Sequence, residues 1–138
     1  MKIYFAASIR GGRDDAGLYA QLIESLKNYG MVLTEHLGLG KEKLSSYGEA
    51  DLADKEIYNR DTILINEADV VVAEVSTPSL GVGYELGYAE GKGKKILCLY
   101  RPQVSKRLSA MVNGNGNLKV VEYTDLAQAL TAIDNFLK

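Results

Sequence analysis

The sequence is poor in the residues that bind metal ions, form disulfides or support histidine-dependent catalysis. Its 138 residues include one histidine, one cysteine and no tryptophan. A structural zinc site takes about four nitrogen or sulfur ligands, so metal binding by His and Cys is almost excluded. A Ser-His-Asp arrangement would depend on His36 alone. One cysteine forms no internal disulfide and favours a reducing compartment. We therefore expect no metal ion and no cofactor.

Long hydrophobic runs and an excess of charge of one sign are also absent. No apolar run approaches the roughly 18 residues of a membrane span, and the stretch 3–7 is too short for the core of a signal peptide. Sixteen basic and eighteen acidic side chains give a net charge of −2, which provides no bulk attraction to a nucleic-acid backbone. The sequence thus predicts a single cytoplasmic domain over residues 1–138, with neither a membrane nor a nucleic-acid polymer as its partner.

Short apolar runs alternate with helix-period patterns along the chain. This alternation predicts an α/β fold, a flavodoxin-like three-layer sandwich with a five-stranded parallel sheet. The strands are expected over 3–7, 31–34, 69–75, 95–100 and 118–122, and the helices over 18–29, 52–67, 84–90, 105–112 and 126–137. Ligands of open α/β sheets bind beyond the carboxyl ends of the strands, which directs attention to the loops 8–13, 35–50, 76–83 and 101–109.

The loop after the first strand has the composition of an anion-binding site. Ser8 offers a hydroxyl and Arg10 and Arg13 offer guanidinium donors. Gly11 and Gly12 allow a ligand to approach the backbone closely. The alternative is a tight turn between strand and helix with two solvated arginines.

The segment 79–87 is a second candidate for anion binding. Its serine and glycines lead into a helix N-terminus, where unpaired backbone N–H groups favour an anion. Glu85 is expected in the first turn of that helix. The alternative is that Glu85 only compensates the helix dipole, while Gly83 and Gly87 serve packing.

Asp61 interrupts an apolar stripe of the second helix. It lies three or four residues from the apolar residues Ile57, Tyr58, Leu64 and Ile65, which predicts a carboxylate in the middle of the inward face. A buried charge has to be paired, protonated or open to a cavity. The alternative is a rotated stripe that leaves Asp61 at its solvated edge.

Asp61 and Glu85 together suit the cleavage of a glycosidic bond. Such chemistry uses one carboxylate as a nucleophile or ion stabiliser and one carboxyl group as a proton donor. Tyr4, in the first strand, is placed to hydrogen-bond a catalytic carboxylate. Glu74, at the end of the third strand, more simply orders the loop that follows it. His36 is either a polar contact in the pocket or a loop residue.

Several blocks of the sequence, in order along the chain, resemble one known family. They are Tyr4–Arg13 (YFAASIRGGR), Leu33–His36 (LTEH), Ala68–Val75 (ADVVVAEV), Pro78–Gly87 (PSLGVGYELG), Ile96–Pro102 (ILCLYRP) and Leu108–Met111 (LSAM). They resemble the 2′-deoxynucleoside 5′-monophosphate N-glycosidases of the nucleoside 2-deoxyribosyltransferase superfamily. Beyond Met111 the similarity is one of general character only.

The resemblance implies a homodimer that hydrolyses the N-glycosidic bond of a deoxynucleotide, releasing free base and 2-deoxyribose 5-phosphate. It implies Glu85 as the nucleophile, Asp61 as the acid/base group and Tyr4 as the residue that orients the carboxylate. For the 5′-phosphate, it implies contacts from Ser8, Arg10, Ser79, Gly81 and Ser109, with Ser109 coming from the partner subunit. On the base side, it implies Ile9 and His36, and the remaining substrate-binding residues that it implies are Gly11 and Met111.

Two departures from the family pattern limit what the resemblance implies. Ala7 stands where the pattern has glycine, and residues 41–55 diverge, so base preference is not carried over.

One alternative function is that of a nucleoside 2-deoxyribosyltransferase, which exchanges bases through the same intermediate. Another is a non-catalytic nucleotide-binding module, which needs the loops but not Asp61. Serines and Arg10 at the 5′ end of the sugar favour a phosphate over a free hydroxyl, and hence the hydrolase.

Overall fold

The computed structural model describes residues 1–9, 15–34 and 52–138. The elements follow one another as β1 (Lys2–Ala7), α1 (Ala16–Leu26), β2 (Met31–Val32), α3 (Asp54–Glu67), β3 (Val70–Glu74), α4 (Leu80–Gly91), β4 (Lys95–Tyr100), α5 (Ala110–Asn113), β5 (Lys119–Glu122) and α6 (Leu126–Leu137). Within the described ranges, no helix has both the length and the apolar character needed to cross a membrane. The predicted loop over 35–50 lies outside the described residues.

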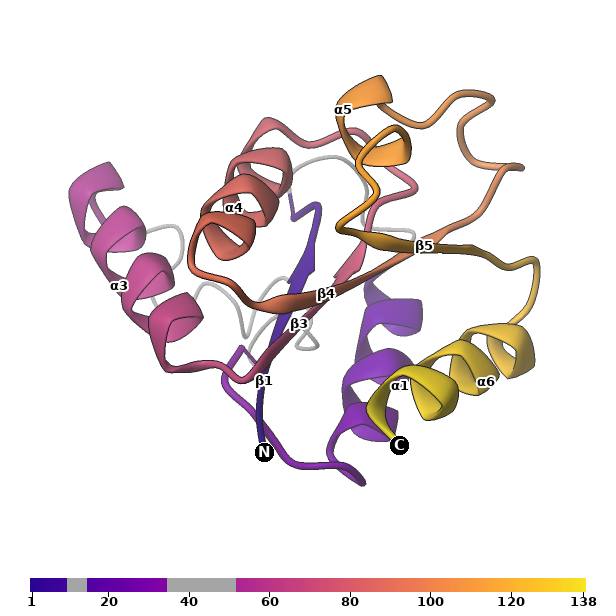
Figure 1. Ribbon diagram of the computed structural model, residues 1–138, viewed down its shortest axis with the longest axis horizontal. Coiled ribbons are helices and arrows are strands. Elements are labelled where there is room, and N and C mark those ends of the chain that lie inside the picture. The colour runs from indigo at the N-terminus through magenta and orange to yellow at the C-terminus, as the bar shows by residue number, and fades with distance from the viewer. Residues whose placement is uncertain (10–14, 35–51) are drawn as a thin grey trace.

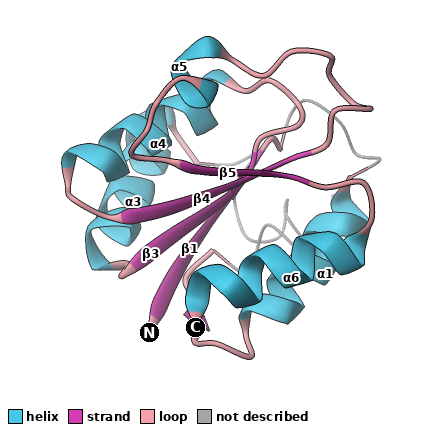
Figure 2. Cartoon of the chain, turned by 45° about the vertical axis from the view of Figure 1, so that its right-hand side comes forward, coloured by secondary structure: helices cyan, strands magenta, loops and turns pink. Residues whose placement is uncertain are grey.

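The five strands form one sheet in the order β2-β1-β3-β4-β5, and every neighbouring pair is parallel. Helices α1 and α6 lie side by side against one face of the sheet, whereas α3 and α4 cover the other (Figure 1, Figure 2). This is the predicted three-layer α/β sandwich. The strand order reverses between β1 and β3, which places the ligand crevice of such a sheet at their carboxyl ends.

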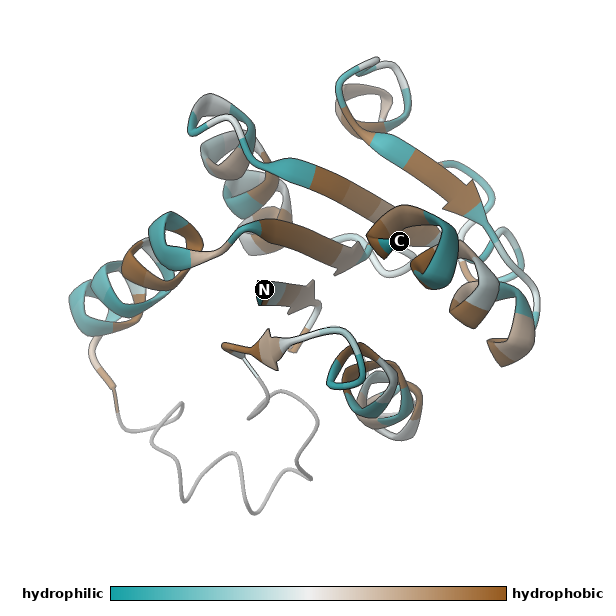
Figure 3. Ribbon diagram, turned by 60° about the horizontal axis from the view of Figure 1, so that its bottom comes forward, coloured by the Kyte–Doolittle hydropathy of each residue, from teal (hydrophilic) through white to brown (hydrophobic). Residues whose placement is uncertain are grey.

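Alternate residues of the strands enter two separate cores, as the two-residue period of a strand requires. In β1, Ile3 and Phe5 pack with α1 and α6, whereas Tyr4 and Ala6 pack on the side of α3 and α4. The central strands are buried on both faces and therefore read as continuous apolar runs, which Figure 3 shows as hydrophobic colour along the sheet. The phenol of Tyr4 consequently points to the side of the sheet that α3 and α4 cover.

Helix α4 begins four residues earlier than predicted. The side chain of Ser79 accepts a hydrogen bond from the N–H of Val82 at 3.2 Å and so caps the helix before Leu80. Gly81 therefore belongs to the first turn of α4 rather than to the loop before it. Glu85 lies in the second turn, and its predicted place in the first turn was wrong.

The second strand and the fifth helix are shorter than predicted. β2 ends at Val32 because the Thr34 hydroxyl takes over the pairing with β1. It accepts from the N–H of Phe5 at 2.8 Å and donates to the carbonyl oxygen of Phe5 at 2.7 Å. The helix expected over 105–112 is reduced to α5, whose first N–H groups are capped by the Ser109 side chain.

Replacing Thr34 with valine is expected to lower the free energy of unfolding by about 1–3 kcal/mol, because the buried N–H of Phe5 loses its acceptor while the side-chain shape is kept. Urea unfolding of the variant and the wild type measures this difference. Thr131→Val is the control, since it removes an exposed hydroxyl that bonds a helix carbonyl, and it should leave the midpoint nearly unchanged. Equal losses in both variants would contradict the role given to Thr34.

Candidate active site

Tyr4 and Glu85 meet between the sheet and α4. Tyr4, in the middle of β1, is 2% exposed, and its hydroxyl donates a hydrogen bond to Oε2 of Glu85. Glu85 is half-buried on α4. Because a fully packed strand residue supplies the donor, β1 fixes the rotation of the carboxylate. The hydrogen bond expected of Tyr4 is therefore present, while the catalytic roles of the two residues stay predictions.

Asp61 lies on α3, at the edge of the same region. Its side chain is 22% exposed and accepts a hydrogen bond from Nε of Arg60 at 2.8 Å. Helix α3 is buried at Ile65, whereas Tyr58 is half exposed. The inward stripe predicted for this helix was therefore wrong at Tyr58. Asp61 is largely buried on the side of α3 that faces Tyr4, and it is paired with Arg60, as a buried charge requires.

The negative charges of Glu85 and Asp61 both act on the hydroxyl of Tyr4. Burial raises the pKa of Tyr4 far above its usual value, the negative charges of Glu85 and Asp61 raise it further, and Arg60 acts in the opposite direction. Coulombic effects weaken with distance, so these four groups form one electrostatic cluster. Tyr4 stays protonated at physiological pH and remains a hydrogen-bond donor.

The N-terminus of α4 presents donors of the predicted phosphate site. The Ser79 hydroxyl accepts from Val82 and so keeps its own proton to donate to an anion. The first N–H groups of a helix, including that of Gly81, have no acceptor within the helix. Ser8 is buried beyond the end of β1, and Ile9 beside it is exposed. Other predicted binding residues, which are Arg10, Gly11, Gly12 and Arg13 of the first loop and His36, lie outside the described residues.

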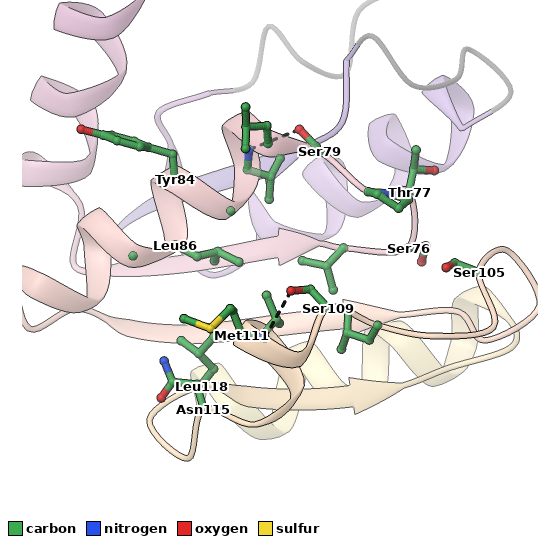
Figure 4. Close-up of a pocket in the computed structure, with 18 of the residues that line it drawn as sticks. Ser76, Thr77, Ser79, Tyr84, Leu86, Ser105, Ser109, Met111, Asn115 and Leu118 are labelled. Carbon is green, nitrogen blue, oxygen red and sulfur yellow. Dashed lines mark hydrogen bonds between the residues drawn. The ribbon is translucent and has the colours of Figure 1, made fainter.

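A pocket of about 890 Å³ lies between α4 and the segment that leads to α5. Ser79 lines one side of it, and Ser109 and Met111 line the other (Figure 4). The Ser109 hydroxyl accepts from the N–H of Met111 at 3.2 Å and keeps its own proton as a donor. Neither Asp61 nor Glu85 lines this pocket. The pocket of one chain thus does not bring Ser109 and Met111 together with the candidate catalytic carboxylates.

Glu74 orders the loops beyond the sheet, as predicted, and does not join the cluster of Tyr4, Asp61 and Glu85. It is 1% exposed and accepts hydrogen bonds from the N–H and hydroxyl of Ser76 at 2.7 and 2.9 Å, from Nε of Arg101 at 3.1 Å, and from the hydroxyl of Tyr123. Nη2 of Arg101 donates to Asp15 at 2.8 Å. This network ties the loop after β3 and the loop after β4 to the start of α1.

The sequence interpretation missed two arginines, Arg60 and Arg101. Adjacent residues of a helix point about 100° apart, so spacing gives no indication that Arg60 would fold back onto Asp61. Arg101 joins Glu74 and Asp15, which are 27 and 86 residues away along the chain. The sequence signal that could have indicated the Arg60 pairing is that a cation directly precedes a carboxylate, at 60–61, on a helix that also carries apolar residues.

The arrangement can support the cleavage of a glycosidic bond. Two carboxylates from different helices lie near one phenol, and one of the two is held by that phenol. Donors for an anion lie one turn before Glu85 on the same helix. A substrate with a phosphate at one end and a bond to a leaving group near Glu85 would match this layout.

Comparisons with known proteins add independent evidence. Residues 3–120 match the family model described as nucleoside 2-deoxyribosyltransferase. The chain is 52% identical over 118 residues to a Tetraodon nigroviridis protein named 5-hydroxymethyl-dUMP N-hydrolase, covering 85% of this chain and 82% of that protein. A Mus musculus protein of the same name is 49% identical over 127 residues, covering 91% and 72%. The fold is similar to that of Clostridium botulinum CMP N-glycosidase BcmB, with a TM-score of 0.66 and 16% identity over 99% of this chain and 100% of that one.

Proposed function

The chain belongs to the nucleoside 2-deoxyribosyltransferase family, and from this premise we propose that it hydrolyses the N-glycosidic bond of 2′-deoxynucleoside 5′-monophosphates to free base and 2-deoxyribose 5-phosphate. The observation that carries the proposal is the hydrogen bond from the buried Tyr4 hydroxyl to Glu85, with Asp61 beside them. The names of the relatives make 5-hydroxymethyl-dUMP the first substrate to test.

Glu85 is the proposed nucleophile. One of its carboxylate oxygens attacks C1′ while the bond from C1′ to the base nitrogen breaks, through a transition state with oxocarbenium character. Tyr4 holds the carboxylate in one rotation by donating to Oε2, which lowers the entropy lost on reaching the transition state. A 2′-deoxy sugar lacks the electron-withdrawing hydroxyl next to C1′, and this eases the development of positive charge.

Asp61 is the proposed acid/base group. It lies near the hydroxyl of Tyr4 but on α3, so it approaches the reacting carbon from a different element than Glu85. We assign to it the proton that the departing base needs. Water then attacks C1′, and the sugar phosphate leaves Glu85.

The phosphate is proposed to bind at the N-terminus of α4. Ser79 offers its hydroxyl proton, and Gly81 offers a backbone N–H. Because Gly81 and Glu85 are four residues apart on one helix, the helix rises about 6 Å between them. The phosphate and the nucleophile are thus held on one rigid element, which fixes where C1′ lies once the phosphate is bound.

One assay separates this function from its alternatives. The protein is incubated with each 2′-deoxynucleoside 5′-monophosphate, 5-hydroxymethyl-dUMP included, and with each deoxynucleoside, with and without free base. Base release is followed by chromatography. Hydrolysis of the monophosphates alone supports the proposal. Exchange of one base for another would instead indicate a deoxyribosyltransferase, and binding without turnover would indicate a nucleotide-binding module.

We also infer a homodimer in which Ser109 acts across the interface. The pocket between α4 and α5 is bordered by large apolar side chains that one chain leaves exposed: Leu80 is 95%, Met111 84% and Tyr84 60% exposed. Such side chains gathered around one pocket are typical of an interaction surface. A two-fold interface presents the same patch on both subunits, so each chain's Ser109 and Met111 would approach the other chain's α4.

Mixing two inactive variants tests this shared site. Glu85→Gln lacks the nucleophile, and Ser109→Asp places a negative charge against the phosphate. A mixed dimer then contains one intact site, built from Glu85 of one chain and Ser109 of the other. After denaturation and joint refolding in equal amounts, activity is expected to return to about a quarter of the wild-type value, since half of the dimers are mixed and each has one site of two. A mixture no more active than its parents would contradict a shared site.

The proposed location is the cytoplasm. Cys98 is a free, fully buried thiol in β4, and burial raises its pKa to about 12. An inert thiol of this kind serves packing. A lone unpaired cysteine supports the expectation of a reducing compartment.

A further inference from the structure

The pair Arg60–Asp61 is unusual for its place on a helix. Neighbouring helix residues diverge by about 100°, yet Nε of Arg60 turns back to Oδ1 of Asp61 at 2.8 Å. Both side chains are about three-quarters buried, at 26% and 22% exposure. The pair is therefore partly removed from solvent, where its charges interact more strongly than on an open surface.

The Oδ1 oxygen of the Asp61 carboxylate is paired with Arg60. Within the described part of the chain, Arg60 is the single hydrogen-bond donor to Asp61, and Oδ2 accepts none. The titratable and charged groups that share this cluster are Tyr4 from β1, Glu85 from α4 and Arg60 from α3 itself. The negative charges of Asp61 and Glu85 repel each other, and the positive charge of the Arg60 guanidinium offsets this repulsion.

We propose that Arg60 is a positioning residue for the second half of the reaction, in which its guanidinium holds the Asp61 carboxylate by Oδ1 so that the other carboxylate oxygen takes the proton of the attacking water. This inference rests on the proposed function. In this step the water oxygen bonds to C1′ and the bond from C1′ to Glu85 breaks with its electron pair returning to the carboxylate. One water proton passes to Asp61, and the products are 2-deoxyribose 5-phosphate and free Glu85.

Arg60→Gln is the test, because it removes the cation and keeps a side chain of similar length. We expect base release in the first turnover to stay within about threefold of the wild type, whereas steady-state kcat falls about tenfold or more. KM should fall together with kcat, since the covalent intermediate then accumulates. Mass spectrometry of the quenched enzyme should show Glu85 carrying the sugar phosphate.

Two matched variants serve as controls. Arg60→Lys keeps the charge and should restore most of kcat, and Lys55→Gln removes an exposed cation from the same helix and should behave as the wild type. Unchanged kcat in Arg60→Gln, or equal losses in the first turnover and in kcat without an accumulated adduct, would overturn the inference while leaving the proposed function intact. Absence of base release by the wild-type protein would overturn both.

Discussion

Replacing Glu85 with glutamine is expected to lower the turnover of a 2′-deoxynucleoside 5′-monophosphate by about 10³-fold or more, while its dissociation constant changes by less than about fivefold. Glutamine keeps the size of the side chain and an oxygen that accepts from the Tyr4 hydroxyl. The proposed phosphate donors at Ser79 and Gly81 are unchanged, so the substrate should still bind. The substitution removes the carboxylate that is proposed to attack C1′. Base release followed by chromatography gives turnover, and calorimetric titration gives the dissociation constant.

Glu67→Gln is the matched control, since it makes the same substitution at an exposed position of α3. It should retain wild-type turnover and affinity. Turnover retained in Glu85→Gln would exclude Glu85 as the nucleophile. A parallel loss of binding and turnover would instead indicate that Glu85 acts mainly in holding the substrate.

Replacing Arg101 with methionine is expected to lower the free energy of unfolding by about 3–5 kcal/mol, because it leaves the carboxylate of Glu74 buried without its cation. The carboxylate of Glu74 is fully buried, while the side chains of Arg101 and Asp15 are 14% and 17% exposed. Asp15 loses its partner as well, so the start of α1 should loosen together with the loop after β4. Urea unfolding, followed by circular dichroism, measures the loss.

Two further variants test whether the loss of stability in Arg101→Met comes from its buried pair with Glu74 or from the loss of a charge in general. Lys138→Met breaks the exposed pair with Asp134 and should leave the unfolding midpoint nearly unchanged. Glu74→Gln combined with Arg101→Met removes both charges and should cost less than the sum of the single substitutions. Additive losses in that double variant would contradict a direct interaction between Glu74 and Arg101.

The strands could be predicted from the sequence because parallel strands buried on both faces read as continuous apolar runs. The predicted strand 95–100 coincides with β4. The ends of helices were harder to predict, since the residue at which a helix begins or ends can depend on a single hydrogen bond. The glycines at 81 and 83 weigh against a helix, yet the Ser79 cap starts α4 before them. The first helix was expected to end at residue 29, but α1 ends at Leu26. Glycine is needed at position 30 because a Cβ there would lie 2.2 Å from the carbonyl oxygen of Met1.

The candidate site was predictable to the extent that topology determines it. Strand order brings the end of β1 close to α3 and α4, so Tyr4, Asp61 and Glu85 could be assigned to one region before any contact was known. Which turns of α3 pack against the sheet could not be predicted, because Tyr58 and Ile65 are seven residues apart on the same face of the helix, and tertiary packing alone decides which is buried. The pairing of Arg60 with Asp61 depends on side-chain torsions, about which sequence spacing carries no information.

Among the described residues, α3 packs into the core mainly through its last turns, and Tyr58 adds an edge-to-face contact with Tyr84 of α4. Ile65 is its buried residue, and its residues 54–56 are exposed. Asp61 lies one turn before Ile65, between the exposed first turn of the helix and its packed last turns. Opening of the first turns exposes little apolar surface, so it takes only a fraction of the free energy of global unfolding. On warming, the proposed proton carrier would lose its place while β1 and α4 still hold Tyr4 and Glu85, and catalysis would fail in a molecule that is still folded.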